Sequence, residues 1–387
     1  MIVNAKKVLY LQYTNPTAYP PLENSSRILG DLGYDILFFG IRSSGTGNFT
    51  FKMHDKIIVE LMNSEDRGIK QKLHFIRYIW KSFMIARAFK PDWIYVSDMM
   101  ATPVGLFLKK IGYKIIYHEH DSPSSEAGSS LLMKWVNRCR NSLALKADMV
   151  VVPQHQRIQF VKQDTGSNRP FHCVWNCPLK ADIPDDYFHH ERQAGEPLKL
   201  YYHGSINLER IPLTLIEGAK RSGVPIIIRA VGYETIGSSG ASNALRKAAS
   251  GSLVNLELPG SFSHFELREQ IKGMHVGWNC YKNESNDLNL QHLAGASNKS
   301  FDYLSSGLAL IVNDSPEWIE MFETPGYARS TNSHCPDSIA NTLRWLYENP
   351  SLVSEMGQKG RDRIITDWNY EKQFETVLTE MGLSARK

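Results

Sequence analysis

Three polar side chains at the start of a predicted helix are spaced so that they can act together on one ligand. Lys299 lies three residues before Asp302, and Asn298 lies four before it, so all three share one face of the first helical turns. A helix start also offers free N–H groups and the positive end of the helix dipole. An ammonium, a carboxylate and free amides together suit a diphosphate attached to a polyol. An exposed Lys–Asp pair on an ordinary capped helix would show the same spacing.

The residues around this helix indicate where in a fold it lies. The helix breaks at Gly307, and the chain continues as a short apolar run that is typical of a buried parallel strand. Before the helix, the apolar run Val276–Cys280 is followed by a long polar loop. The helix therefore starts near the carboxyl end of a sheet, where ligands bind in open α/β proteins.

A glycine and a second cation follow another predicted strand. The strand Leu200–His203 ends in Gly204 and Ser205, and Arg210 comes six residues after the glycine. A glycine at a strand end lets the backbone approach a phosphate, and a cation one loop later can reach the same oxygens. Such a spacing arises often by chance, and the presence of Lys299 elsewhere in the same half gives it weight.

The first half of the chain has a polar strand end of its own. A predicted strand runs into His118, Glu119, His120 and Asp121, so two imidazoles and two carboxylates meet at its terminus. We expect substrate chemistry there, with His118 and Asp121 among the acceptor-binding residues. Tyr19, in the Pro-rich loop after the first strand, is a further candidate for the acceptor pocket. The alternative is that a histidine or Asp121 only caps the next helix.

Short apolar runs alternate with helix-like stretches along the chain, which predicts parallel sheets. One series ends before the polar segment 178–197, which contains prolines and a glycine, and a fresh series begins at Leu198. We therefore predict an α/β protein with two doubly wound domains and a cleft between them. The predicted domains are residues 1–192 and 193–365, followed by a terminal helix in residues 366–387.

The first half of the chain is basic. Residues 1–192 contain 25 Lys and Arg against 18 Asp and Glu, or +7, and the remainder contains 19 against 22, or −3. Within this half, the predicted helix Gly68–Lys90 carries apolar residues at helical spacing, namely Ile69, Leu73, Ile76, Trp80 and Phe83. We expect this stripe to pack on the sheet. Five cations lie between the members of the stripe: Lys70, Lys72, Arg77, Lys81 and Arg87. They indicate that this face contacts an anionic acceptor or an anionic membrane; the alternative is that they are only solvated.

Composition narrows the class of protein. A chain of 387 residues with 42% hydrophobic content can bury two cores. No apolar stretch approaches the roughly 18 residues that a membrane span requires, and the chain starts without an apolar signal segment, so we expect a cytoplasmic protein. The five cysteines show no C-x-x-C spacing, and we expect neither disulfides nor a metal site.

The stretch 298–314 resembles a motif of the retaining glycosyltransferases with two facing Rossmann-like domains (GT-B fold, family 4-like). In that family the motif reads Lys, two residues, Glu-Tyr, a small residue, Gly and a Pro-Val-Ile strand. The corresponding residues here are Lys299, Asp302, Tyr303, Ser306, Gly307 and Leu310-Ile311-Val312. The resemblance extends along nearly the whole chain, but three positions depart from it: Ala294 replaces a second Glu, Ala309 replaces the strand's Pro, and Ser205 replaces a first cation.

The resemblance implies roles for individual residues. Lys299 and Arg210 would hold the leaving diphosphate, Asp302 would bind the ribose, and His120 would face the donor sugar, so that His120, Arg210 and Lys299 form the catalytic set. Phe262 would pack against the nucleobase, and the terminal helix would cross back onto the first domain. The full set of implied donor-binding residues is Gly204, Ser205, Arg210, Phe262, Gly295, Ala296, Ser297, Asn298, Lys299 and Asp302.

The reaction implied by the resemblance is transfer of a hexose from a nucleoside diphosphate sugar, with UDP as the expected nucleotide. The enzyme would be retaining and metal-independent, would need no cofactor, and would act in polysaccharide or glycoconjugate synthesis. Its partners would be the sugar donor and a saccharide or lipid-linked acceptor, but no nucleic acid. Peripheral contact with an anionic membrane is a separate expectation, which rests on the basic helix of the first half. Two alternatives remain at this stage: a nucleotide-sugar 2-epimerase of the same fold and a non-catalytic protein that binds nucleotide sugars.

Overall fold

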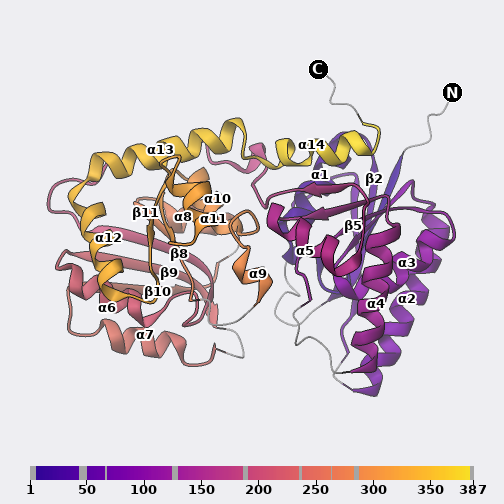
Figure 1. The fold of residues 1–387 in the computed structure, drawn as a ribbon, viewed down its shortest axis with the longest axis horizontal. Coiled ribbons are helices and arrows are strands. Elements are labelled where there is room, and N and C mark those ends of the chain that lie inside the picture. Colours follow the sequence, from indigo (N-terminus) through magenta and orange to yellow (C-terminus); the bar gives the residue numbers. More distant parts are fainter. Residues whose placement is uncertain are drawn as a thin grey trace. The chain divides into compact units, whose positions relative to one another are not determined.

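Two parallel β-sheets with flanking helices form the framework of the chain in this computed structural model (Figure 1). The structure describes residues 6–42, 50–65, 68–123, 130–185, 191–234, 238–262, 264–282 and 287–383. The packing of the chain defines two units. Unit 1 comprises Met1–Asn176, Asp287–Ala296 and Tyr370–Lys387, and unit 2 comprises Cys177–Asn286 and Ser297–Asn369. The predicted α/β class is confirmed.

The described residues of unit 1 form a seven-stranded parallel sheet in the order β3-β2-β1-β4-β5-β6-β7. Its strands are β1 (Lys7–Leu11), β2 (Asp35–Arg42), β3 (Ile57–Asn63), β4 (Trp93–Ser97), β5 (Lys114–His118), β6 (Met149–Val152) and β7 (Phe171–Cys173). Its helices are α1 (Pro20–Asp31), α2 (Ile69–Phe89), α3 (Thr102–Lys110), α4 (Leu131–Lys146), α5 (His155–Thr165), α9 (Leu288–Gln291) and α14 (Tyr370–Glu380). Helix α14 packs against α1, where the Tyr370 hydroxyl donates a hydrogen bond to the Pro21 carbonyl (3.0 Å).

The described residues of unit 2 form a six-stranded parallel sheet in the order β10-β9-β8-β11-β12-β13. Its strands are β8 (Leu198–Ile206), β9 (Ile226–Glu234), β10 (Val254–Gly260), β11 (Val276–Asn279), β12 (Ala309–Asn313) and β13 (Ala328–Thr331). Its helices are α6 (Leu213–Ser222), α7 (Ala241–Ala249), α8 (His264–Ile271), α10 (Asn298–Ser305), α11 (Pro316–Trp318), α12 (Pro336–Glu348) and α13 (Pro350–Thr366).

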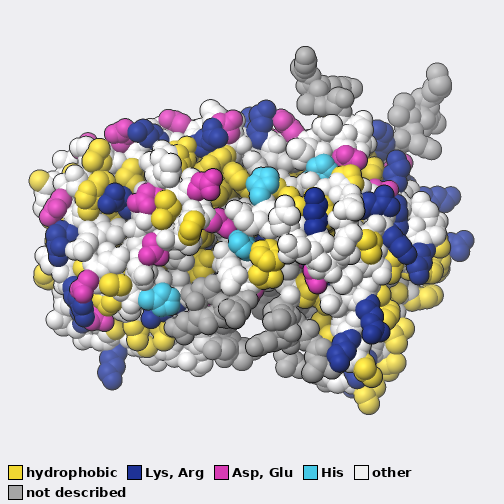
Figure 2. Space-filling view, in the orientation of Figure 1, with side chains coloured by type: hydrophobic (Ala, Val, Ile, Leu, Met, Phe, Trp, Pro, Cys, Tyr) yellow, Lys and Arg dark blue, Asp and Glu magenta, His cyan; other side chains and the backbone are white. Residues whose placement is uncertain are grey.

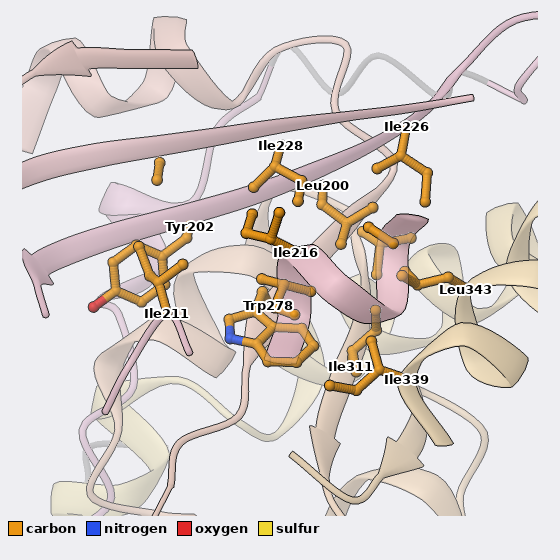
Figure 3. Close-up of a cluster of buried hydrophobic side chains, with 14 of the residues drawn as sticks. Leu200, Tyr202, Ile211, Ile216, Ile226, Ile228, Trp278, Ile311, Ile339 and Leu343 are labelled. Carbon is orange, nitrogen blue, oxygen red and sulfur yellow. The ribbon is translucent and has the colours of Figure 1, made fainter. Parts of the chain in front are cut away.

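The alternation of side chains along β8 assigns its residues to two different layers. Leu200 and Tyr202 face a buried apolar layer that also contains Trp278 of β11, Ile216 of α6 and Ile339 of α12 (Figure 3). Because successive side chains of a strand point to opposite faces, the residue after Tyr202 points to the other side of the sheet. There its ring meets Tyr303 of α10 with centroids 5.0 Å apart. The strand pattern therefore places one polar strand-end residue, His203, beneath the helix that the sequence predicts to bind a ligand.

The face of helix α2 that packs against the sheet differs from the predicted face. Four of the five residues of the predicted inward stripe are exposed: Ile69 is 78% exposed, Leu73 and Ile76 are each 62% exposed, and Trp80 is 59% exposed. The fifth, Phe83, is partly buried and packs against the core. The buried face consists instead of His74, Phe75, Tyr78, Ser82 and Ala86. The predicted packing of α2 is therefore wrong.

Two packing requirements explain the observed orientation of α2. Tyr78 stacks on Phe39 of β2, with ring centroids 5.4 Å apart and an interplanar angle of 7°, and it meets Tyr13 edge-on at 5.0 Å. Ser82 and Ala86 are small and let the helix approach the sheet closely. These side chains also recur at helical spacing, so periodicity alone could not distinguish the two faces.

No helix in the described part of the chain is long and apolar enough to span a bilayer.

Candidate active site

A short polar network holds the first turn of α10 at the carboxyl end of β11. The Asn279 side chain, at the last residue of β11, donates hydrogen bonds to the hydroxyl oxygens of Ser297 (2.9 Å) and Ser300 (2.6 Å). Ser297 precedes the helix, and its side chain caps none of the helix N–H groups. The first-turn amides and the positive end of the dipole therefore remain available to an anion. The side-chain oxygen of Asn298 is buried at the same place, and no described residue hydrogen-bonds to it.

Lys299 folds back over the end of β8. A methyl group added at Gly204 would lie 3.0 Å from Lys299 Cε and 3.6 Å from its Nζ, so the lysine lies against a surface without a side chain. Gly204 has a φ of +129°, which glycine adopts readily. Behind it, a methyl group at Gly232 of β9 would lie 1.7 Å from the Gly204 carbonyl oxygen. The two glycines let the strand end and the ammonium approach the same ligand, and the neighbouring Ser205 carbonyl accepts a hydrogen bond from the Tyr202 hydroxyl (2.7 Å).

The electrostatic environment of Lys299 favours an anion. Burial is the main reason that its pKa falls to about 8; the positive charge of Arg210 lowers it further, and Asp302 acts in the opposite direction. Arg210 lies in the loop after β8, where its N–H donates to the Asn207 side chain (2.8 Å) and its guanidinium lies 5.3 Å from the ring centroid of Tyr281. An anion between two cations that disfavour each other would stabilise both charges. This part of unit 2 is therefore suited to a phosphate or diphosphate.

Asp302 is paired with a histidine at the end of β8. His203 Nε2 lies 3.3 Å from Asp302 Oδ2, and the carboxylate side chain is 27% exposed, so a ligand can still reach it. Tyr303 supports His203, because its hydroxyl accepts the His203 N–H (3.0 Å). The Tyr303 ring also covers Gly277, where an added methyl group would lie 2.2 Å from Cδ2. His203 was absent from the predicted site; its position beside Gly204 was the available signal. A partly exposed carboxylate can accept hydrogen bonds from neighbouring hydroxyls of a ligand.

The other predicted donor-binding residues are distributed over both units. Phe262 is half-buried and follows β10, the edge strand that is two places from β8 in the sheet. Gly295 and Ala296 belong to unit 1 and are anchored there by Asn176. The Asn176 N–H donates to the Gly295 carbonyl (3.0 Å), and its side-chain amide donates to the Ala296 carbonyl (2.7 Å). In unit 2, therefore, the structure gathers Gly204, Arg210, Asn298, Lys299 and Asp302 around one helix start.

In unit 1, the rings of three predicted residues pack together at the carboxyl end of β5. The ring centroids of His118 and His120 are 3.7 Å apart, and those of Tyr19 and His120 are 5.4 Å apart. His118 shares a hydrogen bond with the Tyr95 hydroxyl (2.7 Å), and His120 Nε2 shares one with the Ser97 hydroxyl (2.7 Å). Burial lowers the pKa of His120 to about 3 and that of His118 well below its ordinary value, so both rings are neutral at pH 7. Because His118 is fully buried, its position favours support of His120 over direct contact with an acceptor.

A buried ion pair fixes the turn that carries these histidines. Glu119 and Arg140 are 2% and 1% exposed, and their side chains form two hydrogen bonds, Nε to Oε2 (2.7 Å) and NH2 to Oε1 (2.5 Å). The hydroxyls of Tyr117 (2.8 Å) and Ser122 (2.6 Å) donate to the same carboxylate. Arg140 also pairs with Asp164. Glu119 is thus fully engaged within the protein, and this explains why one of the two carboxylates at the strand end is not offered to a substrate.

Arg157 joins the His120 turn to the segment 287–296. Its guanidinium donates to the carbonyls of His120 (2.6 Å), Asn289 (2.8 Å) and His292 (3.0 Å). Asp121, whose side chain is 76% exposed, lies 3.9 Å from the same guanidinium. The segment belongs to unit 1 although the sequence on both sides of it belongs to unit 2. No sequence pattern had indicated this excursion.

Among the described residues, no group of three or more His, Cys, Asp or Glu side chains is arranged to hold a metal ion. All five cysteines lie in the described part of the chain and are free thiols.

Comparison with known proteins places this geometry in a family. Residues 224–379, which contain α10 and its lysine, match the family described as glycosyl transferase-like. HepE from Anabaena, crystallised in complex with UDP, has a TM-score of 0.71 at 14% identity, with 97% of this chain and 99% of that chain covered. Residues 224–379 belong to this glycosyl transferase-like family, and the chain has the GT-B fold. The predicted family, the enzyme class and the two Rossmann-like domains are thereby confirmed.

Two further glycosyltransferase comparisons give the same fold. Sucrose-phosphate synthase from Thermosynechococcus elongatus has a TM-score of 0.70 at 12% identity, with 97% of each chain covered. An E. coli structure described as trehalose-6-phosphate, bound with UDP-2-fluoro glucose, has a TM-score of 0.66 at 12% identity, with 98% of this chain and 100% of that chain covered. No curated protein sequence is significantly similar to this chain.

The buried ion pair yields a stability prediction. Glu119→Gln leaves the Arg140 guanidinium buried without its main partner, so the free energy of unfolding should fall by roughly 3 kcal/mol. Urea denaturation of the two proteins measures this difference. Asp367→Asn, which breaks an exposed pair with Arg363, is the matched control and should change the same quantity by less than about 1 kcal/mol. Similar losses in both variants would contradict a structural role for the buried pair.

Proposed function

We propose that this protein is a retaining, metal-independent hexosyltransferase that uses a UDP-sugar and works without a cofactor. The acceptor is a saccharide or lipid-linked saccharide, and the product serves polysaccharide or glycoconjugate synthesis. The enzyme acts in the cytoplasm, at the inner face of the membrane, and has no nucleic-acid partner. UDP is the proposed nucleotide because HepE, which has the same fold, was crystallised with UDP and with UDP-glucose.

The observation that carries the proposal is the Lys299 ammonium held against Gly204 at an uncapped helix start. Cleavage of a sugar–diphosphate bond leaves negative charge on the diphosphate. Lys299, Arg210 and the first amides of α10 are fixed before the reaction, so they can stabilise this charge without rearranging. Each such donor typically contributes about 3 kcal/mol in the transition state.

The remaining residues have proposed roles that follow from their chemistry. Asp302, oriented by His203, accepts hydrogen bonds from the ribose hydroxyls. His120 is neutral and provides a hydrogen-bonding group for the transferred sugar, while Tyr19 and Asp121 contact the acceptor. Retention follows if the acceptor attacks from the side of the leaving diphosphate, whose oxygen then takes the acceptor proton. This route needs no protein nucleophile.

Substitution of the lysine tests the proposal directly. Lys299→Ala should lower turnover by roughly 100- to 1000-fold, because one preorganised cation is lost from the transition state. Turnover is measured with a panel of UDP-, GDP- and ADP-sugars, and formation of product only when an acceptor is present excludes the 2-epimerase reaction. Lys220→Ala, at an exposed position of α6, removes the same charge elsewhere in unit 2 and should have no effect. Turnover of Lys299→Ala within a few-fold of the parent would refute the assignment.

The lowered pKa of Lys299 also predicts how nucleotide binding depends on pH. The ammonium is the binding form; it is fully present below about pH 8 and is lost as the pH rises through that value. UDP affinity should therefore be constant near pH 7 and fall by up to tenfold per pH unit above about pH 8. Isothermal titration calorimetry measures the affinity between about pH 7 and pH 9.5. Lys299→Met should bind UDP more weakly, with no decline over this range; an equal decline in both proteins would assign the titration to another group.

A further inference from the structure

Helix α2 presents an apolar stripe to the outside of unit 1. Five large side chains of this stripe are between 46% and 78% exposed: Ile69, Leu73, Ile76, Trp80 and Met84. At about 100° per residue, they form one narrow band on the side of the helix roughly opposite its buried face. The band runs over four helical turns. Single exposed apolar residues are common on proteins, but a continuous stripe of this length marks an interaction surface.

Basic side chains lie along the same stripe. Lys70, Arg77 and Lys81 flank it on one side and Lys72 on the other, while Arg87 follows it toward the end of the helix. The 21 residues of α2 contain no Asp or Glu. Figure 2 shows hydrophobic and basic side chains next to one another in the region where Figure 1 draws α2, α3 and α4. The stripe and these cations together are called the α2 surface below.

We infer that the α2 surface docks unit 1 onto an anionic lipid bilayer. The helix would lie in the plane of the interface, with its apolar stripe among the upper acyl chains and its cations at the lipid headgroups. Trp80, near the middle of the stripe, is of the side-chain type enriched at this depth of a membrane. Each cation near an anionic membrane surface strengthens binding, and salt screens this attraction over about 10 Å at 0.1 M.

The charge of α2 favours a membrane over a second copy of the chain. In a symmetric dimer the same surface would occur on both sides of the interface, so two helices of five cations and no carboxylates would face each other. Lysines and arginines with long aliphatic stems can instead keep their charges at the headgroups while the stripe is buried. The inference does not depend on the proposed reaction, because it rests on unit 1 alone.

Vesicle binding tests the inference with the full chain and two variants of α2. The parent should bind vesicles that contain phosphatidylserine or phosphatidylglycerol, bind phosphatidylcholine vesicles poorly, and lose affinity between about 0.1 M and about 1 M salt. Lys70/Arg77/Lys81→Gln should bind the anionic vesicles roughly 100-fold more weakly at the lower salt. Ile76/Trp80→Ser should bind them at least tenfold more weakly at both salt concentrations, because it removes buried apolar area. The charge-matched control is Lys220/Arg246/Lys247→Gln in unit 2, which should bind as the parent does.

Two further measurements make the result decisive. Thermal unfolding and UDP binding of both α2 variants should match the parent, since the changed residues lie on the surface of unit 1. Because UDP binding is measured apart from vesicle binding, a failure of the proposed reaction can be distinguished from a failure of this inference. Equal and salt-insensitive partitioning of the parent and both α2 variants would overturn the inference. A parent that is dimeric in sedimentation and becomes monomeric through Ile76/Trp80→Ser would overturn it as well, in favour of self-association.

Discussion

The site in unit 2 depends on one close approach, that of the Lys299 side chain to the backbone of Gly204. A lysine ammonium loses free energy when it leaves water, and a nearby arginine adds to that cost, which is why the pKa of Lys299 falls to about 8. Other parts of unit 2 compensate for this cost through ordinary packing. Asn279 fixes the start of α10, Tyr303 fills the space over Gly277, and the closely packed Gly232 supports the end of β8. The result is a cationic site that is preorganised to bind the negative charge of a ligand.

The far end of α10 is held as firmly as its start. Arg361 of α13 donates to the Ser305 carbonyl in the last turn of the helix. At Gly357 an added methyl group would lie 2.0 Å from the carbonyl oxygen of Gly307, so α13 packs directly on the turn between α10 and β12. These contacts stabilise the helix at the end where its carbonyls are unsatisfied. Unit 1 uses a different device, the buried Glu119–Arg140 pair, to hold a turn that presents neutral imidazoles.

Sequence reasoning succeeded where local chemistry and periodicity agreed. The run of Lys299, Asp302 and Gly307 predicted a helix start, a helix and a following strand, and the structure has α10 and β12 there. It failed for α2, because that helix has two stripes at helical spacing and the less apolar one packs inside. It could not foresee the excursion of segment 287–296 into unit 1, where hydrogen bonds from Arg157 and Asn176 to distant carbonyls hold the segment. A single sequence does not show which distant main-chain carbonyls a side chain will bind.

The central claim is that the start of α10 and the end of β8 form the diphosphate site, and hydrogen–deuterium exchange with saturating UDP tests it most directly. Bound phosphate oxygens would accept hydrogen bonds from first-turn amides and slow their exchange. The account predicts that UDP protects peptides covering residues 203–210 and 297–302, while the amides of α13 exchange as in the free protein. Full occupancy by UDP without protection in either peptide would contradict the account.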